Sequence, residues 1–176
     1  METINIDHLS SSVDKEKYVE KCIQEKGLDI HFEYSSDFRN AKTLRDFIEI
    51  IFVKFKVSPK YIARFILATD EMNNNAIEYW SLSHENNYLR VNIAREWKNL
   101  SIVIEVEDSW NWRSAKTAEQ MEEYRNERMN EDFRHHTSIR GRGLFLIIIK
   151  IVDELYFRNT QNGWLIVGFK KDLLSI

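Results

Sequence analysis

Residues 67–80 read Leu67-Ala68-Thr69-Asp70-Glu71-Met72-Asn73-Asn74-Asn75-Ala76-Ile77-Glu78-Tyr79-Trp80 and carry the clearest pattern in the sequence. With Pro59 at its start, this stretch is the second half of a predicted helix, because the first helical position does not need a backbone donor. At about 100° per residue, one narrow arc of the helix is apolar and is expected to face the core. The arc consists of Tyr61, Phe65, Ala68, Met72, Ala76 and Tyr79.

Beside that arc runs a polar stripe of Glu71, Asn75 and Glu78. Glu71 and Asn75 lie one turn apart, so a carboxylate and a carboxamide oxygen are aimed at the same place. Successive asparagines form helices poorly, each at a cost of roughly half a kcal/mol relative to alanine. The stripe is therefore either a solvated face that happens to carry asparagines or a functional site, and the helix alone leaves both interpretations open.

Size and composition limit the class of protein. The 176 residues, 43% of them hydrophobic, suffice for one domain with a core. A net charge of -3 gives no basic surface for direct binding of nucleic acid. The single cysteine, Cys22, cannot form an internal disulfide, which is typical of a reducing compartment. With no signal-peptide pattern and no apolar run beyond residues 144–149, we expect a soluble cytoplasmic protein without a membrane segment.

Hydrophobic spacing predicts the other elements. In chain order they are a loose lead-in at 1–13, a short helix at 14–26, a strand at 30–35, a helix with its apolar face at 44–55, the helix from Pro59, strands at 89–93 and 102–106, a long charged loop at 109–140, a buried helix at 141–152, and a hairpin of strands at 153–158 and 164–170. This order predicts an α+β fold: a two-layer α/β sandwich with helices on one face of a mixed, mostly antiparallel sheet. Trp97, Trp164 and Tyr88 are expected to pack within strands.

Two further segments can meet the polar stripe in such a sandwich. Asp108 follows a strand, and a buried carboxylate there needs a donor. The exocyclic amine of adenine is one that a ligand can supply, in a bond of roughly 1.5–3 kcal/mol. Residues 140–144 open the buried helix, whose free backbone N–H groups and dipole favour phosphate. Alone, a Gly-x-Gly before a helix is more often a turn than a phosphate site.

Together these motifs resemble a known family. Glu71-x-x-x-Asn75-Ala76 on a helix, Asp108 at a strand end and the glycine-rich run at 141–147 are similar to the GHKL (histidine-kinase-like, or Bergerat) ATP-binding fold. Within it, the short chain and the two terminal strands look most like the anti-sigma-factor serine/threonine kinases of bacterial partner-switching systems. The resemblance implies an N-terminal extension with a short helix at 1–26 and an ATP-binding domain at 27–176, with a lid at about 111–140.

The resemblance also implies a set of roles, with ATP and Mg²⁺ as cofactors. Asn75 would coordinate Mg²⁺ through its amide oxygen. Glu71 would orient or deprotonate the attacking hydroxyl of a protein serine or threonine. Asp108 would accept a hydrogen bond from the adenine amine. The residues that would bind the phosphates are Arg140, Gly141, Arg142, Gly143 and Leu144. The partners implied are a sigma factor and an antagonist protein that is phosphorylated, and the implied assembly is a homodimer.

The sequence departs from the family at Trp110, where the family has glycine. A non-glycine residue in a strained turn costs roughly 1–3 kcal/mol, comparable with the gain from the Asp108 hydrogen bond. The kinase hypothesis therefore stands beside a second one, a protein-interaction module on the same fold that binds nucleotide weakly or not at all. A third interpretation, the catalytic part of a histidine kinase, is disfavoured because residues 1–26 are too short for a phosphoacceptor helix pair.

Overall fold

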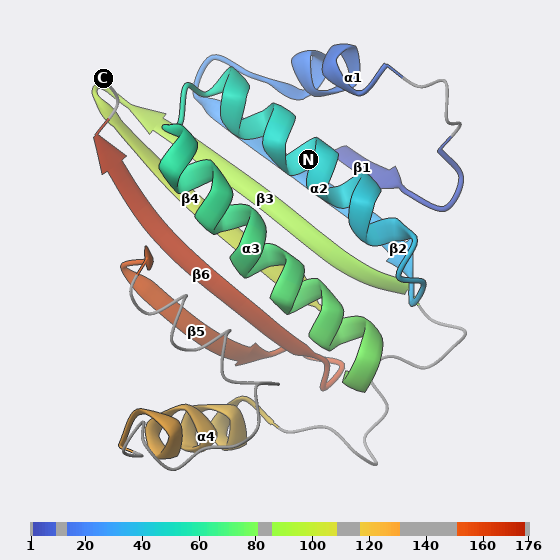
Figure 1. The fold of residues 1–176 in the computed structure, drawn as a ribbon, viewed down its shortest axis with the longest axis vertical. Coiled ribbons are helices and arrows are strands. Elements are labelled where there is room, and N and C mark those ends of the chain that lie inside the picture. The colour runs from blue at the N-terminus through green and yellow to red at the C-terminus, as the bar shows by residue number, and fades with distance from the viewer. Residues whose placement is uncertain (1, 10–13, 81–85, 109–116, 131–150, 175–176) are drawn as a thin grey trace.

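The computed structural model describes residues 2–9, 14–80, 86–108, 117–130 and 151–174 (Figure 1). Its elements are, in chain order, β1 (Glu2–Asn5), α1 (Lys15–Cys22), β2 (Gly27–Ser35), α2 (Asn40–Lys54), α3 (Pro59–Asn75), a π-helical turn η1 (Ala76–Trp80), β3 (Asn86–Glu96), β4 (Asn99–Glu107), α4 (Ala118–Asn130), β5 (Glu154–Asn159) and β6 (Leu165–Leu174). The described strands form one sheet in the order β1-β2-β3-β4-β6-β5. All neighbours are antiparallel except β1, which runs parallel to β2.

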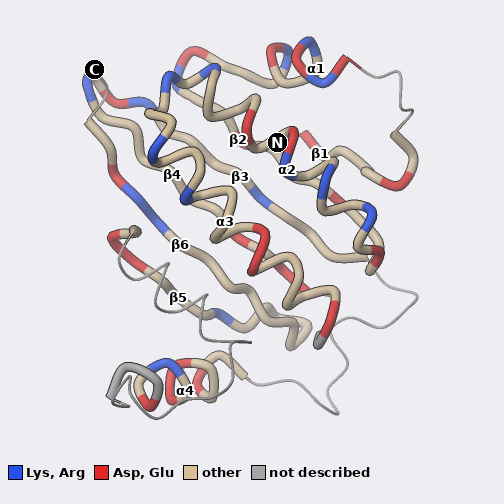
Figure 2. The backbone as a smooth tube through the Cα atoms, viewed as in Figure 1, with Lys and Arg blue, Asp and Glu red and all other residues tan. Residues whose placement is uncertain are grey.

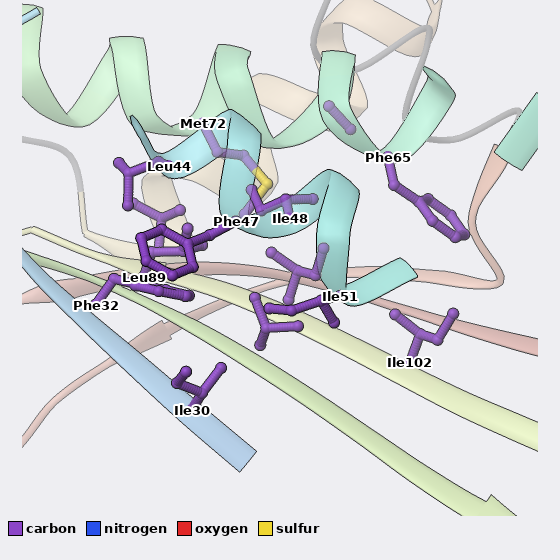
Figure 3. Close-up of a cluster of buried hydrophobic side chains, with 14 of the residues drawn as sticks. Ile30, Phe32, Leu44, Phe47, Ile48, Ile51, Phe65, Met72, Leu89 and Ile102 are labelled. Carbon is purple, nitrogen blue, oxygen red and sulfur yellow. The ribbon is translucent and has the colours of Figure 1, made fainter. Parts of the chain in front are cut away.

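Helices α2 and α3 lie side by side on one face of the sheet and follow the direction of its strands (Figure 1). The strands alternate, so every second side chain points at these helices. Figure 3 shows Leu44, Phe47 and Ile48 of α2 among the buried side chains between the helices and the sheet. The strand residues beneath them, Ile30 and Phe32 among them, are fully buried. The predicted two-layer sandwich is confirmed, with one strand more than the sequence suggested.

The opposite face of the sheet is held together by charge pairs. Arg90 of β3 donates two hydrogen bonds of 2.9 Å to Asp29 of β2 and one of 3.1 Å to Glu105 of β4. The other oxygen of Glu105 accepts from Tyr156 at 2.8 Å and from Arg158 at 2.7 Å, both on β5. A carboxylate that is only 7% exposed thus has three donors, which compensates for its lost hydration.

A glycine makes one of these contacts possible. Tyr156 on β5 and Glu105 on β4 lie on either side of Gly168 in β6. A Cβ at position 168 would approach the Tyr156 ring to 2.5 Å, so only glycine leaves room for the ring to cross the intervening strand. Gly168 therefore lets an edge strand contribute to the charge pairs at the centre of the sheet.

The expectation of a loose lead-in is wrong at β1. Ile4 and Ile6 are 3% and 4% exposed and belong to the main core. Two alternating isoleucines are too short a pattern to stand out among polar neighbours, and the pairing with β2 that fixes them is a tertiary contact. The division of the chain at residue 27 stays a prediction.

The expected loop at 109–140 is wrong over α4, which spans Ala118–Asn130. Met121 is buried, and Ala118 and Tyr124 pack against the core beside it, but these three side chains stand among many charged ones, so the apolar pattern of the helix is weak. The helix instead docks through Arg125, whose side chain donates to the Leu155 carbonyl of β5 at 2.9 Å. Of the predicted helix at 141–152, all but the last two residues lie outside the described part of the chain.

The prediction that Trp97 packs within a strand is wrong. Trp97 occupies the turn between β3 and β4, with a positive φ of 54° and a fully exposed side chain. Tyr88 lies half-buried in β3 as expected, and Trp164 is half-buried just before β6. Within the described ranges, no helix has the length and apolar character needed to cross a membrane.

Candidate functional site

The second half of α3 places the predicted stripe at the edge of the core. Phe65, Ala68 and Met72 are buried, as the predicted arc requires, while Glu71 and Asn75 are half-buried. The side chains of Glu71 and Asn75 make no ion pair or hydrogen bond with the described residues, although the side chain of the preceding Asp70 pairs with Arg45 of α2 at 2.6 Å. The carboxylate and the amide therefore keep their oxygens available for a ligand.

The helix changes its winding directly after Asn75. Residues 76–80 form the π-helical turn η1, in which the hydrogen bonds span one residue more than in an α-helix. Such turns are rare and occur frequently at functional sites, because they redirect the side chains on either side of them. No residue pattern in the sequence predicts this turn.

Asp108 lies at the end of β4 with 1% of its surface exposed. Its backbone N–H donates to the Leu165 carbonyl and its Oδ1 accepts from the Leu165 N–H, both at 3.1 Å. The second carboxyl oxygen, Oδ2, is buried and has no hydrogen-bond partner among the described residues. Such an oxygen requires either a proton of its own or a donor from a ligand.

The charge state of Asp108 reflects this environment. Burial raises the pKa of its carboxyl group to about 7, the Leu165 N–H opposes the shift, and the neighbouring Glu107 adds to it. The pKa of Glu107 is itself raised, chiefly by its own burial. A carboxyl group that titrates near neutral pH inside a protein is a candidate for a functional role, because both of its forms are accessible there.

Further buried polar side chains lie at the same end of the sheet. Tyr34 of β2 pairs with Asn87 of β3, and Asp108 lies across from Asn87, one step beyond the Tyr88–Glu107 pair. Above this row, Asn73 of α3 is 1% exposed and its Oδ1 accepts from the Tyr34 hydroxyl at 2.7 Å. Burial raises the pKa of Tyr34 well above its ordinary value, and the nearby charge of Asp108 raises it further.

Sequence reasoning missed Tyr34, Asn73 and Asn87. Asn73 lies four residues after Thr69, and both are buried beside the predicted arc. The helical spacing therefore places Asn73 on the side of α3 that faces the core. A polar residue at such a position cannot be explained until its hydrogen-bond partner is known. That partner, Tyr34, is 39 residues away in the sequence.

Charge is distributed unevenly along α3. Figure 2 shows Lys and Arg on its first half and Asp and Glu on its second half. A triphosphate near Glu71 would therefore need cationic help from another segment. The predicted phosphate-binding residues Arg140, Gly141, Arg142, Gly143 and Leu144 lie outside the described residues, as does Trp110.

The chain belongs to the histidine kinase-like ATPase domain family, whose pattern matches residues 34–168. The resemblance to the GHKL fold inferred from Glu71, Asn75 and Asp108 is thereby confirmed. The fold is also similar to that of a chain in the crystal structure of the SiaB-SiaC complex from Pseudomonas aeruginosa, with a TM-score of 0.54 and 14% sequence identity. That similarity covers 94% of this chain and 99% of the other, and it concerns the fold alone. The curated proteins include no match.

The described residues fit part of an adenine nucleotide. The orphaned Oδ2 of Asp108 is an acceptor for an amine donor, as the base of ATP would provide. Asn75 offers a neutral oxygen, a ligand type that Mg²⁺ accepts alongside phosphate oxygens. Glu71 offers a carboxylate one turn earlier on the same helix.

Proposed function

We propose that this protein binds Mg-ATP and transfers the γ-phosphoryl group to a serine or threonine hydroxyl of a partner protein, in the manner of an anti-sigma-factor kinase. The observation that carries the proposal is the buried, unpartnered Oδ2 of Asp108 at the end of β4. Membership of an ATPase family and the free oxygens of Glu71 and Asn75 on α3 support it.

Asp108 recognises the base in this proposal. Its Oδ1 stays bonded to the Leu165 N–H, which fixes the plane of the carboxyl group. Oδ2 then accepts from the exocyclic amine, and a donor at this position favours the charged form of the carboxyl. A charge-assisted bond in a buried site contributes roughly 1.5–3 kcal/mol, or about 10- to 150-fold in affinity.

Glu71 and Asn75 act on the other end of the nucleotide. Asn75 would offer its amide oxygen to the Mg²⁺ that accompanies ATP, which would supply positive charge beside the phosphates. Glu71 orients the attacking hydroxyl and takes its proton as the new oxygen–phosphorus bond forms and ADP leaves. Bound Mg-ATP supplies the phosphoryl group. Residues 140–144 would hold its phosphate oxygens, and residues 111–140 would cover it.

Protein partners complete the proposal. The similar fold occurs in a solved complex of two proteins, SiaB and SiaC, which supports a role in protein contact. By resemblance to the anti-sigma-factor kinases, the partners are a sigma factor and an antagonist that carries the phosphorylated residue. A homodimeric assembly stays a prediction.

Calorimetric titration with Mg-ATP tests the nucleotide site. We expect saturable binding by the wild type and a loss of at least about tenfold in Asp108→Asn, whose amide group turns a donor toward the base amine. Asp46→Asn is the matched control, because Asp46 pairs with Lys15 on the other side of α2 and should leave the affinity unchanged. If millimolar Mg-ATP gives neither heat nor a melting shift in the wild type, the kinase proposal is wrong.

The second candidate function is a protein-interaction module that has lost tight nucleotide binding, and Trp110 in the place of the family's glycine favours it. Phosphoryl transfer distinguishes the two. Incubation with radiolabelled ATP and the partner protein should label a serine or threonine if the kinase proposal holds. Abolition of that label by Glu71→Ala, with nucleotide affinity retained, would exclude the interaction module.

A further inference from the structure

The end of the sheet opposite Asp108 exposes two large apolar side chains. Trp97, in the turn between β3 and β4, is 100% exposed, and Leu174, at the end of β6, is 82% exposed. Asn99 pairs with Glu96 on one side and with Leu174 on the other, so the turn and the end of β6 are neighbours. Figure 1 shows both at the upper left end of the sheet. The two side chains form an apolar knob that no described part of the chain covers.

Trp97 is held in a backbone conformation that suits glycine. Its φ of 54° lies in the left-handed region, where a residue with a large side chain is strained. A fully exposed side chain gains no packing within the fold that could offset this strain. Strained residues of this kind cluster at functional sites. The turn therefore keeps an indole in solvent at the expense of stability, which indicates a role for the indole outside the fold.

Four exposed cations lie at the same end of the molecule. Lys98 is the second residue of the turn. Arg95 donates its backbone N–H to the Lys26 carbonyl at 2.8 Å, which places the segment before β2 beside the end of β3. The guanidinium of Arg95 lies 5.3 Å from the centre of the Phe55 ring, and Lys56 follows Phe55 in the loop between α2 and α3. Three segments distant in sequence thus bring positive charge to the apolar knob.

The charges at this end do not cancel. The four cations make no ion pair with the described residues, and the carboxylates nearest to them in sequence are Glu25 and Glu96. Asp172, near the end of β6, is already paired with Lys170 at 3.3 Å. Four cations minus two carboxylates leave a net charge of +2, whereas the whole chain carries -3. The first half of α3, whose charged residues are all Lys or Arg, also begins at this end (Figure 2). The four cations and the apolar knob together are called the basic tip.

The composition of the basic tip favours a lipid surface over a protein as its partner. Lysine is depleted at the core of protein interfaces, whereas tryptophan, lysine and arginine are all enriched at the boundary between membrane and water. A tryptophan that anchors a protein interface is surrounded by contacts that exclude water. Trp97 instead protrudes from a two-residue turn with long cationic side chains around it. The basic tip therefore fits the headgroup region of an anionic bilayer.

We propose that the basic tip binds peripherally to anionic phospholipid, with Trp97 and Leu174 inserted among the headgroups and the four cations on the lipid phosphates. Membrane binding strengthens when apolar insertion and attraction to anionic lipid act together, and the tip offers both. β4 runs from Asn99 to Glu107, so Asp108 lies about 30 Å from the tip at roughly 3.4 Å per residue. The proposed nucleotide site would thus face away from the membrane, toward protein partners. The inference does not depend on nucleotide binding.

Co-sedimentation of the wild type with vesicles tests the proposal. One set of vesicles is phosphatidylcholine alone, and the other contains about 30% phosphatidylserine. We expect an affinity at least about tenfold higher for the anionic vesicles. This affinity should fall as the salt concentration rises from about 0.1 M to about 0.5 M, because salt screens the attraction. Absence of binding to the anionic vesicles, or equal binding to both sets, overturns the proposal and leaves a protein as the partner of the tip.

Trp97→Gly tests insertion of the indole, and it relieves the strained φ, so a loss of binding cannot be attributed to misfolding. Affinity for the anionic vesicles should fall about tenfold, and the blue shift of tryptophan emission that these vesicles cause in the wild type should disappear. Phe38→Ala is the matched control, because Phe38 is 57% exposed in the loop between β2 and α2, at the opposite end of the sheet. It should keep both the affinity and the shift. Wild-type affinity in Trp97→Gly, or vesicle binding without a blue shift in the wild type, contradicts the proposal.

Lys98→Ala tests the electrostatic part. Removal of one cation at the lipid surface should weaken binding to the anionic vesicles about fivefold. Lys42→Ala removes the same charge from the first turn of α2, at the end of the sheet near Asp108, and should leave the affinity unchanged. Equal losses in the two variants would mean that net charge alone attracts the protein to the vesicles, and the assignment to the basic tip would be wrong.

Discussion

Burial raises the pKa of the Asp108 carboxyl group from its ordinary value of 3.8 to about 7, so between these two pH values the folded protein keeps a proton that the unfolded chain has released. Because the folded-state pKa is the higher one, the stabilising contribution is fully present below about pH 4 and is lost as the pH rises through 7. We therefore predict that the free energy of unfolding falls between pH 5 and pH 7, with a slope from this group of up to about 1.4 kcal/mol per pH unit.

Urea unfolding of the wild type and of Asp108→Asn at several pH values measures this contribution. Asparagine keeps the acceptor for the Leu165 N–H and does not titrate. The difference between the two proteins should therefore shrink or change sign as the pH rises. Parallel curves would show that Asp108 is not the titrating group, and the orphaned oxygen would then need another explanation.

The sequence predicted roles for Glu71, Asn75 and Asp108 because each stands in a local pattern, either a helical stripe or the end of a strand. Tyr34 and Asn73 stand in no local pattern that marks them as polar partners. Their significance comes from a 2.7 Å hydrogen bond between segments 39 residues apart. Residues whose role depends on a long-range pair are the ones that inspection of a single sequence misses.

The hairpin of β3 and β4 contains a turn with an unfavourable residue. Glu96 pairs with Asn99, which leaves Trp97 and Lys98 as a two-residue turn, and Trp97 adopts a φ of 54°. Two-residue hairpin turns with positive φ at the first position favour glycine, and other residues there cost roughly 1–3 kcal/mol. Trp97 recovers none of this by packing, because its side chain is fully exposed.

We predict that Trp97→Gly raises the free energy of unfolding by about 0.5–1 kcal/mol, since the relief of strain exceeds the extra entropy of the unfolded chain. Chemical denaturation measures the change. Glu96→Gly, one residue earlier in β3, is the matched control and should lower stability by about 0.5–1 kcal/mol, because glycine weakens a strand. A loss of stability in Trp97→Gly would mean that the indole contributes a contact that its exposure does not reveal.

The elements that were predicted correctly have long, regular patterns, as in α2, α3 and the two antiparallel hairpins. α4 and β1 were missed for opposite reasons. α4 has a short apolar face of Ala118, Met121 and Tyr124 among many charged residues, and part of its docking is the Arg125 bond to β5, so its periodicity is weak. β1 buries Ile4 but has only four residues, and its place at the edge of the sheet depends on pairing with β2.

The two-layer arrangement followed from the order of the elements, because apolar faces on helices and strands can be buried together in few ways. The extent of the sheet did not follow. β1 extends the sheet by one strand beyond β2. The two strands are parallel, so no tight turn joins them, and the sequence between them has no hairpin pattern that would predict the pairing. Residues 1–26 were accordingly interpreted as an extension outside the ATP-binding domain.

Stability of the whole domain tests that division. Ile4 is 3% exposed and belongs to the same buried cluster as Phe32 and Leu28 of β2. If β1 folds with the rest of the sheet, Ile4→Ala should lower the free energy of unfolding by about 2–5 kcal/mol, as for other buried isoleucines. Thr3→Ala alters an exposed neighbour in the same strand and should change it by less than about 0.5 kcal/mol. Equal, small effects of both substitutions in a single urea transition would mean that β1 is a dispensable extension. A large effect of Ile4→Ala alone would show that the N-terminal strand folds as part of the core that positions Tyr34.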